Sequence, residues 1–259
     1  MQFNRCCVSK VIVLFYPLDI REETHKGGVS GTGHSKPRKE NKPQMSPGKH
    51  DPRRAFQLER VMLFSDAVFA IAITLLVIEI KVPSVRDGIA NEADLLWAVA
   101  HLAPKFLGFL ISFMLVGMYW TRHHTLFGYV VDYTPKLLWL NLFFLLSIVL
   151  MPFSTGIFGE YSTPSTIHYI MPLVFYVLNI CYSGFTLFLL WRYVGNPANK
   201  VSDDSLTPEI TRAAKTRAVV ISSIFALTIP VAFINAWAAR YVPLLIPLVL
   251  RLANRGKRK

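Results

Sequence analysis

The sequence predicts an all-α membrane protein that crosses a bilayer six times. Of its 259 residues, 53% are hydrophobic and 13% are aromatic, and the mean hydropathy of +0.38 argues against a soluble globular domain. The apolar residues lie in blocks close to the length of about 20 residues that a spanning helix needs. Most basic residues lie outside these blocks, in alternate connections. That alternation predicts the orientation as well as the fold class.

Residues 1–55 are predicted to form a disordered basic tail. From residue 20 onward they are rich in Gly, Lys and Pro, a composition that cannot bury a core. The stretch KVIVLFYPL in this tail is too short to span a bilayer and lacks the small-residue cleavage site of a signal peptide. Because nothing before Met45 contributes to the membrane pattern, we hypothesise that translation starts at Met45.

Six apolar blocks make up a membrane domain over residues 56–252, and residues 253–259 form a second basic tail. The first five blocks have the length of full spans. The sixth is shorter, Pro243 and Pro247 interrupt it and Arg251 closes it, so tilted or re-entrant insertion is an alternative there. In chain order the blocks cover residues 63–82, 96–120, 136–157, 168–191, 218–236 and 238–250.

The basic residues predict that both chain termini are cytoplasmic. The two tails and the connections after the second and fourth blocks hold most of the 28 Lys and Arg residues, an excess typical of cytoplasmic flanks. An even number of spans also requires both termini on one side. The other side carries either ordinary solvated loops or an acidic rim that concentrates cations, formed by Glu79, Asp87, Glu92, Asp94 and Glu160.

The sequence also argues against several classes of function. The basic residues lie at helix flanks and in tails, where anionic lipid rather than nucleic acid explains them. Cys6, Cys7 and Cys181 form neither a disulfide framework nor a metal-ligand pattern. The chain has no HExxH, GxSxG or Walker motif and no carboxylate cluster facing a common site, so we expect neither an enzyme nor a cofactor.

Asp66 is the residue that a membrane-spanning pattern does not explain. A carboxylate within a span costs about 2.5 to 3.5 kcal/mol, so such residues usually face protein or water and have partners. One alternative is that Asp66 marks a helix start near the headgroups. At 100° per residue, Asp66 and Ser65 point away from one apolar face, which predicts that they contact neighbouring helices. That apolar face contains Phe64, Ile71, Leu75, Ile78 and Val82.

The partners of Asp66 are predicted in the second and third blocks. The stretch WTRHH, from Trp120 to His124, ends the second block on the side where Asp66 lies, and Asn141 lies about one turn inside the third. An indole N–H, an imidazole and an amide can all donate to a carboxylate. His123 and His124 are adjacent and point about 100° apart, so structural hydrogen-bond donors are a better interpretation than zinc ligands.

Arg60 followed by Phe64-Ser65-Asp66 matches the Arg-x-x-x-Phe-Ser-Asp signature of the transmembrane protein 175 family of potassium channels. The stretches DAVFAIAITLLVIEIKVP, PKFLGFLISFMLVGMYWTRHHTLF and WLNLFFLLSIVLMPFSTGIFGEY resemble the first three helices of that family. Only one Phe-Ser-Asp occurs, which resembles the prokaryotic single-repeat members with six helices. The resemblance implies a homotetramer around a central pore, in the plasma membrane of a prokaryote.

The resemblance further implies a potassium-selective cation channel, with weak to moderate selectivity, whose pore is lined by the first helix. Carried over by position, Ile71 falls at the main constriction, Thr74 lies one turn later, and Leu75 and Ile78 lie further outward. Their shared helical face agrees with this. No Thr-Val-Gly-Tyr-Gly filter is present, so apolar rings would form a dewetting barrier and the Thr74 hydroxyl would contact potassium ions. Beyond these permeating ions, no metal site is expected.

The family signature is also implied to form a hydrogen-bond network that sets the pose of the pore helix. Arg122 adds a charge beside this network that can compete for Asp66. The alternative function is a proton-conducting channel or a proton-coupled transporter that uses Asp66 with the two histidines. A transporter is disfavoured because no inverted repeat and no clear pair of broken helices occur. The implied network consists of Arg60, Phe64, Ser65, Asp66, Trp120, Asn141 and one of His123 and His124.

Overall fold

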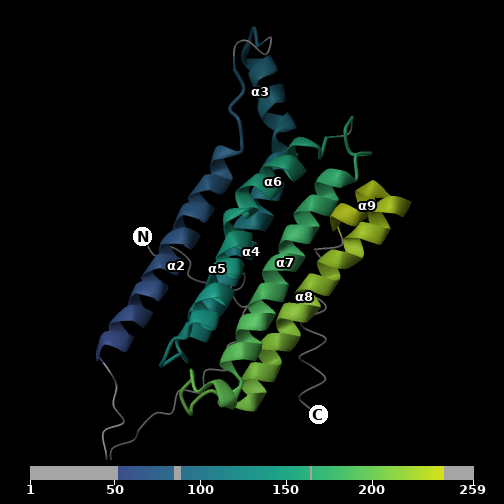
Figure 1. The fold of residues 1–259 in the computed structure, drawn as a ribbon. Helices are drawn as coiled ribbons and strands as arrows, with labels where there is room; N and C mark the ends of the chain where they lie inside the picture. The colour runs from purple at the N-terminus through teal and green to yellow at the C-terminus, as the bar shows by residue number, and fades with distance from the viewer. Residues whose placement is uncertain (1–51, 85–88, 164, 242–259) are drawn as a thin grey trace, which may run out of the picture. The chain divides into compact units, whose positions relative to one another are not determined.

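The computed structural model describes residues 52–84, 89–163 and 165–241, which are mainly helical (Figure 1). The predicted N-terminal tail up to residue 51, the hypothetical start at Met45 and the C-terminal tail lie outside the described residues. The helices are α2 (Pro52–Ile78), α3 (Glu92–His101), α4 (Ala103–Phe127), α5 (Pro135–Val149), α6 (Met151–Glu160), α7 (Met171–Val194), the 3₁₀ helix η2 (Pro197–Asn199), α8 (Pro208–Ile234) and α9 (Ala236–Tyr241).

Five stretches of helix are long and apolar enough to cross a membrane. They correspond to the first five predicted blocks, so the prediction of an all-α chain with several spans is confirmed. The sixth predicted block, residues 238–250, overlaps the end of α9, and its remainder beyond Tyr241 lies outside the described residues. In chain order the five stretches are Arg54–Ile78, Ala103–Phe127, Pro135–Glu160, Met171–Val194 and Pro208–Ile234.

The helix ends differ from the ends of the apolar blocks. α2 begins at Pro52, well before its apolar block, because the Arg, Ala, Gln, Leu and Glu residues that precede the block are good helix formers. α8 begins at Pro208, also before its block, where the Thr207 hydroxyl accepts a hydrogen bond from the Ile210 N–H at 3.3 Å. Hydropathy therefore locates the centre of a span, whereas proline and capping residues set its ends.

The second predicted block is divided between two helices, which corrects its boundaries. Only Leu102 separates α3 from α4, and Pro104 lies in the first turn of α4. Because proline has no N–H to donate, the backbone hydrogen bonds of α3 cannot continue unbroken into α4. The first turn of α3 is capped by Asn91, whose side chain accepts from the Asp94 N–H at 2.9 Å.

The third span also contains a break, at Leu150 between α5 and α6. Pro152, in the first turn of α6, cannot donate a hydrogen bond to the turn before it. The Ile148 carbonyl, four residues before Pro152, therefore lacks its usual helical donor. The buried Asn179 amide of α7 donates to the neighbouring Ser147 carbonyl at 3.1 Å. A hydrogen bond from α7 thus lies beside the break.

α7 forms the centre of the helix bundle. It packs against α5, α6 and α8, while α2 packs against α4, α5 and α6. Figure 1 shows α2 and α8 on opposite sides of the bundle. The core includes Leu76 of α2, Phe144 of α5 and Leu190 of α7, none of which has exposed surface. Each of these helices therefore contributes to one continuous apolar core.

The two ends of the bundle differ in charge. At the basic end, α2, α5 and α8 begin and α4 and α7 end. At the opposite end, α2, α6 and α8 end and α4 and α7 begin. An ion pair between Lys105 and Glu160, with 2.6 Å between charged atoms, lies at the opposite end. The Lys and Arg residues at the basic end include Arg54, Arg60, Arg122, Lys136, Arg192, Lys200, Arg212, Lys215 and Arg217.

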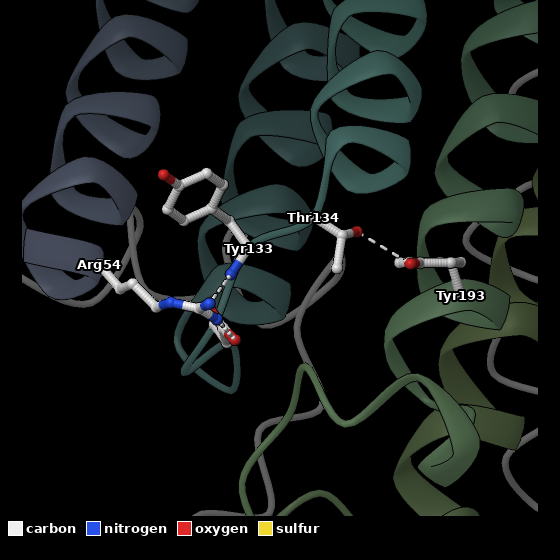
Figure 2. Close-up of polar contacts among 5 residues, drawn as sticks. Arg54, Tyr133, Thr134 and Tyr193 are labelled. Carbon is white, nitrogen blue, oxygen red and sulfur yellow. Dashed lines mark hydrogen bonds and ion pairs between the residues drawn. The ribbon is translucent and has the colours of Figure 1, made fainter. Parts of the chain in front are cut away.

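The connection between α4 and α5 is fastened to its neighbours at the basic end (Figure 2). Arg54 of α2 forms an ion pair with Asp132 at 2.5 Å. The hydroxyl groups of Thr134 and Tyr193 lie 2.8 Å apart, within hydrogen-bonding distance, which joins the start of α5 to the end of α7. These contacts fix the connection against both α2 and α7.

Candidate functional site

One side of α2 is buried and the other is exposed. The buried side chains are spaced three, four or seven residues apart, as expected for a single helical face, and comprise Leu58, Ser65, Phe69, Ala72 and Leu76. The exposed side is also apolar: Ile71 is 58% exposed, Leu75 40% and Ile78 68%. A monomer leaves this stripe uncovered along a membrane helix, so lipid or another protein surface must cover it.

The four residues predicted to line a pore all lie on this exposed side: Ile71, Thr74, Leu75 and Ile78. The Thr74 hydroxyl donates its proton to the Ile71 carbonyl at 2.8 Å. Its oxygen therefore keeps its lone pairs for another contact. An exposed oxygen acceptor among apolar side chains is a group that a cation can contact.

The buried side of α2 is joined to α4 and α5 by a chain of hydrogen bonds. The Ser65 hydroxyl donates to the Val61 carbonyl at 2.8 Å and accepts from the Asn141 amide at 3.0 Å. The Asn141 side-chain carbonyl oxygen therefore faces His123, at 2.7 Å from its Nε2. Since that oxygen can only accept, His123 carries its proton on Nε2. Ser65, Asn141 and His123 are all buried.

Three aromatic rings surround His123 and complete its burial. Its ring stacks on Phe144 with centroids 5.5 Å apart, and Phe127 and Phe69 lie at 4.4 Å and 5.6 Å. Among the described residues, no group of three His, Cys, Asp or Glu side chains is placed to hold a metal ion. The setting of His123 is that of a structural hydrogen-bond donor between helices.

Asp66 makes a separate contact with α4. The Trp120 indole N–H donates to the Asp66 carboxylate at 2.9 Å, and the Trp120 ring lies 5.8 Å from that of His124. The Asn141 amide therefore donates to Ser65 and the His123 imidazole donates to Asn141, whereas the sequence predicted that both would donate to Asp66. Among the described residues, the Arg60 side chain has neither a hydrogen bond nor an ion pair, and Phe64 is 54% exposed.

A second buried polar cluster was not found from the sequence. The Thr155 hydroxyl of α6 donates to Ser112 of α4 at 2.7 Å, and the Ser112 and Tyr176 hydroxyls lie 2.9 Å apart. Asn179 adds a hydrogen bond to Ser154 at 3.2 Å. The only sequence signal was the presence of polar residues within apolar blocks, which is typical of helix contacts in membranes. This cluster joins α4, α6 and α7.

Comparisons with known proteins place the chain among ion channels. A family model described as endosomal/lysosomal potassium channel TMEM175 matches residues 60–152. A protein named as a potassium channel from Streptomyces collinus is 31% identical over 178 residues, which cover 68% of this chain and 83% of that protein. A protein named as an endosomal/lysosomal proton channel from Gallus gallus is 36% identical over 111 residues, 41% of this chain and 22% of that protein.

Solved structures show the same fold. The crystal structure of a lysosomal potassium-selective channel TMEM175 homologue from Chamaesiphon minutus matches with a TM-score of 0.62 and 25% identity, and the match covers 76% of this chain and 97% of that one. A variant of the potassium channel MtTMEM175, solved in complex with a nanobody fusion protein, matches with a TM-score of 0.54 and 18% identity over 77% of this chain and 94% of that one. The residues that the family model matches, 60–152, include α2 from Arg60 onward and the residues of α4 and α5 that hydrogen-bond to it.

Proposed function

Because the chain belongs to the TMEM175 family of potassium channels, we propose that it conducts potassium ions with weak to moderate selectivity over sodium. It is a multi-pass integral membrane protein, and its family is one of ion channels. The observation that carries the proposal is the exposed apolar face of α2, in which Ile71, Leu75 and Ile78 have no cover in a single chain.

We propose that four copies of the chain surround a central pore and that α2 of each copy lines it. Ile71 then forms the main constriction, and Leu75 and Ile78 form further apolar rings that control wetting of the pore. The Thr74 oxygen is the polar group that contacts a passing potassium ion. Its hydrogen bond to the Ile71 carbonyl supports this role, because the hydroxyl proton is already used within the helix.

In this arrangement, the polar contacts of α2 fix the rotation of the helix about its own axis. Hydrogen bonds from Trp120 to Asp66 and from Asn141 to Ser65 hold the helix at two adjacent positions. Adjacent positions point about 100° apart, so two such contacts fix rotation better than one does. The face opposite Ser65 is then turned toward the pore.

We further propose that residues 238–250 form a sixth span and that the basic end faces the cytoplasm of a prokaryotic cell, with both termini there. The Lys and Arg residues gathered at the basic end support this orientation. Labelling a single cysteine, introduced after residue 253 in a variant lacking native cysteines, with an impermeant reagent tests it. Labelling from outside intact cells would contradict the proposed topology.

The test of function is the reversal potential of the purified channel in a bilayer with potassium on one side and sodium on the other. We expect the potential to follow potassium and Ile71→Asn to increase current and weaken selectivity. The matched control is Leu227→Asn on α8, because Leu227 is 55% exposed and Ile71 is 58% exposed. Equal behaviour of both variants would show that α2 does not line the constriction.

A proton-conducting channel is the second candidate, because vertebrate relatives are named as proton channels. Here Asp66, His123 and His124 would carry the proton, either in a channel or in a proton-coupled transporter. The same bilayer under a pH gradient distinguishes the candidates. A reversal potential that follows protons and ignores potassium would favour this second function.

A further inference from the structure

A groove lies between α7 and α8 at the surface of the bundle. Its volume is about 290 Å³, many times the space that one water-sized group needs. Small residues bring the two helices close together here: Gly184 lies directly against Ser222, whose hydroxyl a Cβ at Gly184 would meet. Larger side chains flank this contact, such as Phe185 and Phe188 of α7 and Val219 of α8. None of the described residues that line the groove is charged, so its interior suits an apolar chain.

The two helical faces that form the groove each carry a basic residue toward the basic end. On α7, Phe185 and Phe188 are followed by Arg192, and positions i, i+3 and i+7 share a face. On α8, Lys215 lies four residues before Val219 and so shares its face. Arg192 is exposed and Lys215 is partly buried, and neither side chain has a hydrogen bond or an ion pair within the part of the chain that the structure describes. The two cations therefore extend the two walls of the groove.

Arg192 and Lys215 lie at about the same depth. Gly195, at the end of α7, packs against Thr211 near the start of α8, since a Cβ at Gly195 would collide with the Thr211 side chain. Arg192 comes three residues before Gly195 and Lys215 comes four residues after Thr211, so in these antiparallel helices both lie about one turn closer to the membrane centre. The uncharged stretch of α7 ends at Arg192, and that of α8 begins after Arg217. Both cations therefore lie where phospholipid headgroups meet their acyl chains.

The charge at this end of the groove is positive. Arg212 lies three residues before Lys215 and adds a further cation to the same face of α8. Glu209, in the first turn of α8, precedes Lys215 by six residues, a rotation of about 120° around the helix. Asp203, in the connection between α7 and α8, accepts hydrogen bonds within its own turn. Cations gathered at one end of a groove repel each other, and an anion between them relieves that repulsion.

Lipid is the component that can cover this groove. α8 lies on the opposite side of the bundle from α2 (Figure 1). The proposed arrangement of α2 around a pore therefore turns the groove outward to the bilayer, and this step rests on the proposed function. The short helix α9 does not cover the groove either, because Phe233, on the same face of α8 as Ala226, is 72% exposed.

We propose that this groove binds an anionic phospholipid from the leaflet at the basic end. The Arg192 guanidinium donates hydrogen bonds to two oxygens of the headgroup phosphate, and the Lys215 ammonium neutralises the same group from the other wall. One acyl chain lies along the groove, where Phe185, Phe188 and Val219 contact it. Basic pockets between membrane helices are suited to such headgroups, and this one adds an apolar groove for the chain.

The experiment is native mass spectrometry of the full chain in detergent, titrated with phosphatidylglycerol or with phosphatidylcholine of the same acyl chains. We expect phosphatidylglycerol to be retained preferentially. Arg192→Gln and Lys215→Gln should each weaken its apparent affinity about fivefold, the effect expected for one basic residue at an anionic surface. Arg217→Gln is the matched control, because Arg217 lies two residues after Lys215 but about 200° around α8, where it lines a small space facing α4. It should change the affinity less than about twofold.

A second pair of variants tests the place of the acyl chain. Ala226→Phe fills the groove near the middle of the apolar stretch of α8, so it should lower the retention of phosphatidylglycerol. Leu227→Phe is the control, because Leu227 is 55% exposed and is not among the described residues that line the groove. It should leave retention unchanged. The pair separates binding of a chain in the groove from attraction between charges alone.

Several results would overturn the proposal. Equal retention of the two lipids by the unaltered chain would do so, and this measurement stands even where a variant fails to fold. Unchanged affinity in Arg192→Gln and Lys215→Gln, an equal loss in Arg217→Gln, or full retention in Ala226→Phe would each contradict it. Displacement of the bound lipid by millimolar inorganic phosphate would identify a site for free phosphate instead of phospholipid. Because the readout is bound lipid and not current, its failure is distinguishable from a failure of the proposed conduction.

Discussion

α2 and α7 are both membrane helices, yet the chain uses them in opposite ways. α2 has the most apolar stretch of the five, but only 22% of that stretch is buried, against 56% in α7. The polar residues of α7, such as Asn179, Ser183 and Thr186, are buried and hydrogen-bonded. α2 instead keeps Thr74 on its exposed side. The difference teaches that an apolar residue of this protein need not be buried within one chain. Part of the apolar surface is exposed on a single chain and contacts lipid or another protein surface.

The largest effect on stability is expected from overpacking α7. A Cβ atom at Gly184 would collide with the Ser222 hydroxyl of α8 and lie 3.4 Å from the Ala218 carbonyl. Gly184→Leu should therefore lower the free energy of unfolding by about 3 kcal/mol. Gly117→Leu is the control, because no atom lies within 4 Å of its added Cβ. Thermal unfolding in detergent measures both, and equal stability would show that α7 is not the tightly packed helix described here.

A smaller loss is expected where α2 is attached to the bundle. Asn141→Leu leaves the His123 N–H without its acceptor and Ser65 without its donor, which should cost about 2 kcal/mol. Leu142→Ala, at the exposed neighbouring position, should cost less than about 0.5 kcal/mol. Unfolding by denaturant in detergent compares them. A stable Asn141→Leu variant would mean that α2 is held by apolar packing alone.

Loss of one hydrogen bond at the partly exposed Asp66 should have a milder effect. Trp120→Phe keeps most of the ring but removes the N–H donor, and we expect a loss of about 1 kcal/mol. Trp139→Phe on α5 is the matched control, because Trp139 is 62% exposed. The yield of assembled protein by size-exclusion chromatography is a second readout. An equal yield for both variants would show that the hydrogen bond from Trp120 to Asp66 does not help to attach α2 to the bundle.

The smallest change in stability is expected at Thr74, where the effect should instead be on selectivity. Thr74→Ala removes an exposed hydroxyl, so unfolding should change by less than about 0.5 kcal/mol while the preference for potassium falls. Thr228→Ala on α8 removes a buried hydroxyl that donates to the Phe225 carbonyl at 2.6 Å, and it should lower stability without altering selectivity. Bi-ionic reversal potentials and unfolding curves together separate the two. If Thr228→Ala altered selectivity and Thr74→Ala lowered stability instead, α8 and not α2 would be the helix that contacts the permeating ion.

The sequence predicts the spans well because hydropathy depends on composition alone. It also predicts that Trp120 and Asn141 help to hold the Phe-Ser-Asp segment, since these residues belong to the next two blocks along the chain. It does not predict that Leu102 separates α3 from α4 or that α8 begins as early as Pro208, because backbone hydrogen bonding sets those helix ends. The exposed face of α2 cannot be selected by periodicity, since every face beyond Asp66 is apolar.

The cluster of Ser112, Thr155 and Tyr176 lies beyond sequence-based prediction for a different reason. Its members come from α4, α6 and α7, and their meeting depends on the rotation of each helix about its axis. Hydropathy gives no information about that rotation. The same limit explains why the sequence predicts hydrogen bonds from the amide and the imidazole to Asp66, whereas the Asn141 amide donates to the adjacent Ser65 and the His123 imidazole donates to Asn141.

The break in the third span links two positions in the evolution of this protein. Pro152 cannot donate to the Ile148 carbonyl four residues before it, and beside this break the buried Asn179 amide donates to the Ser147 carbonyl and to the Ser154 hydroxyl. Replacing Asn179 by an apolar residue would remove a donor from both groups at membrane depth. These two acceptors lie on either side of Pro152, so their positions relative to Asn179 depend on the break. Pro152 and Asn179 are therefore expected to diverge together among descendants of this sequence.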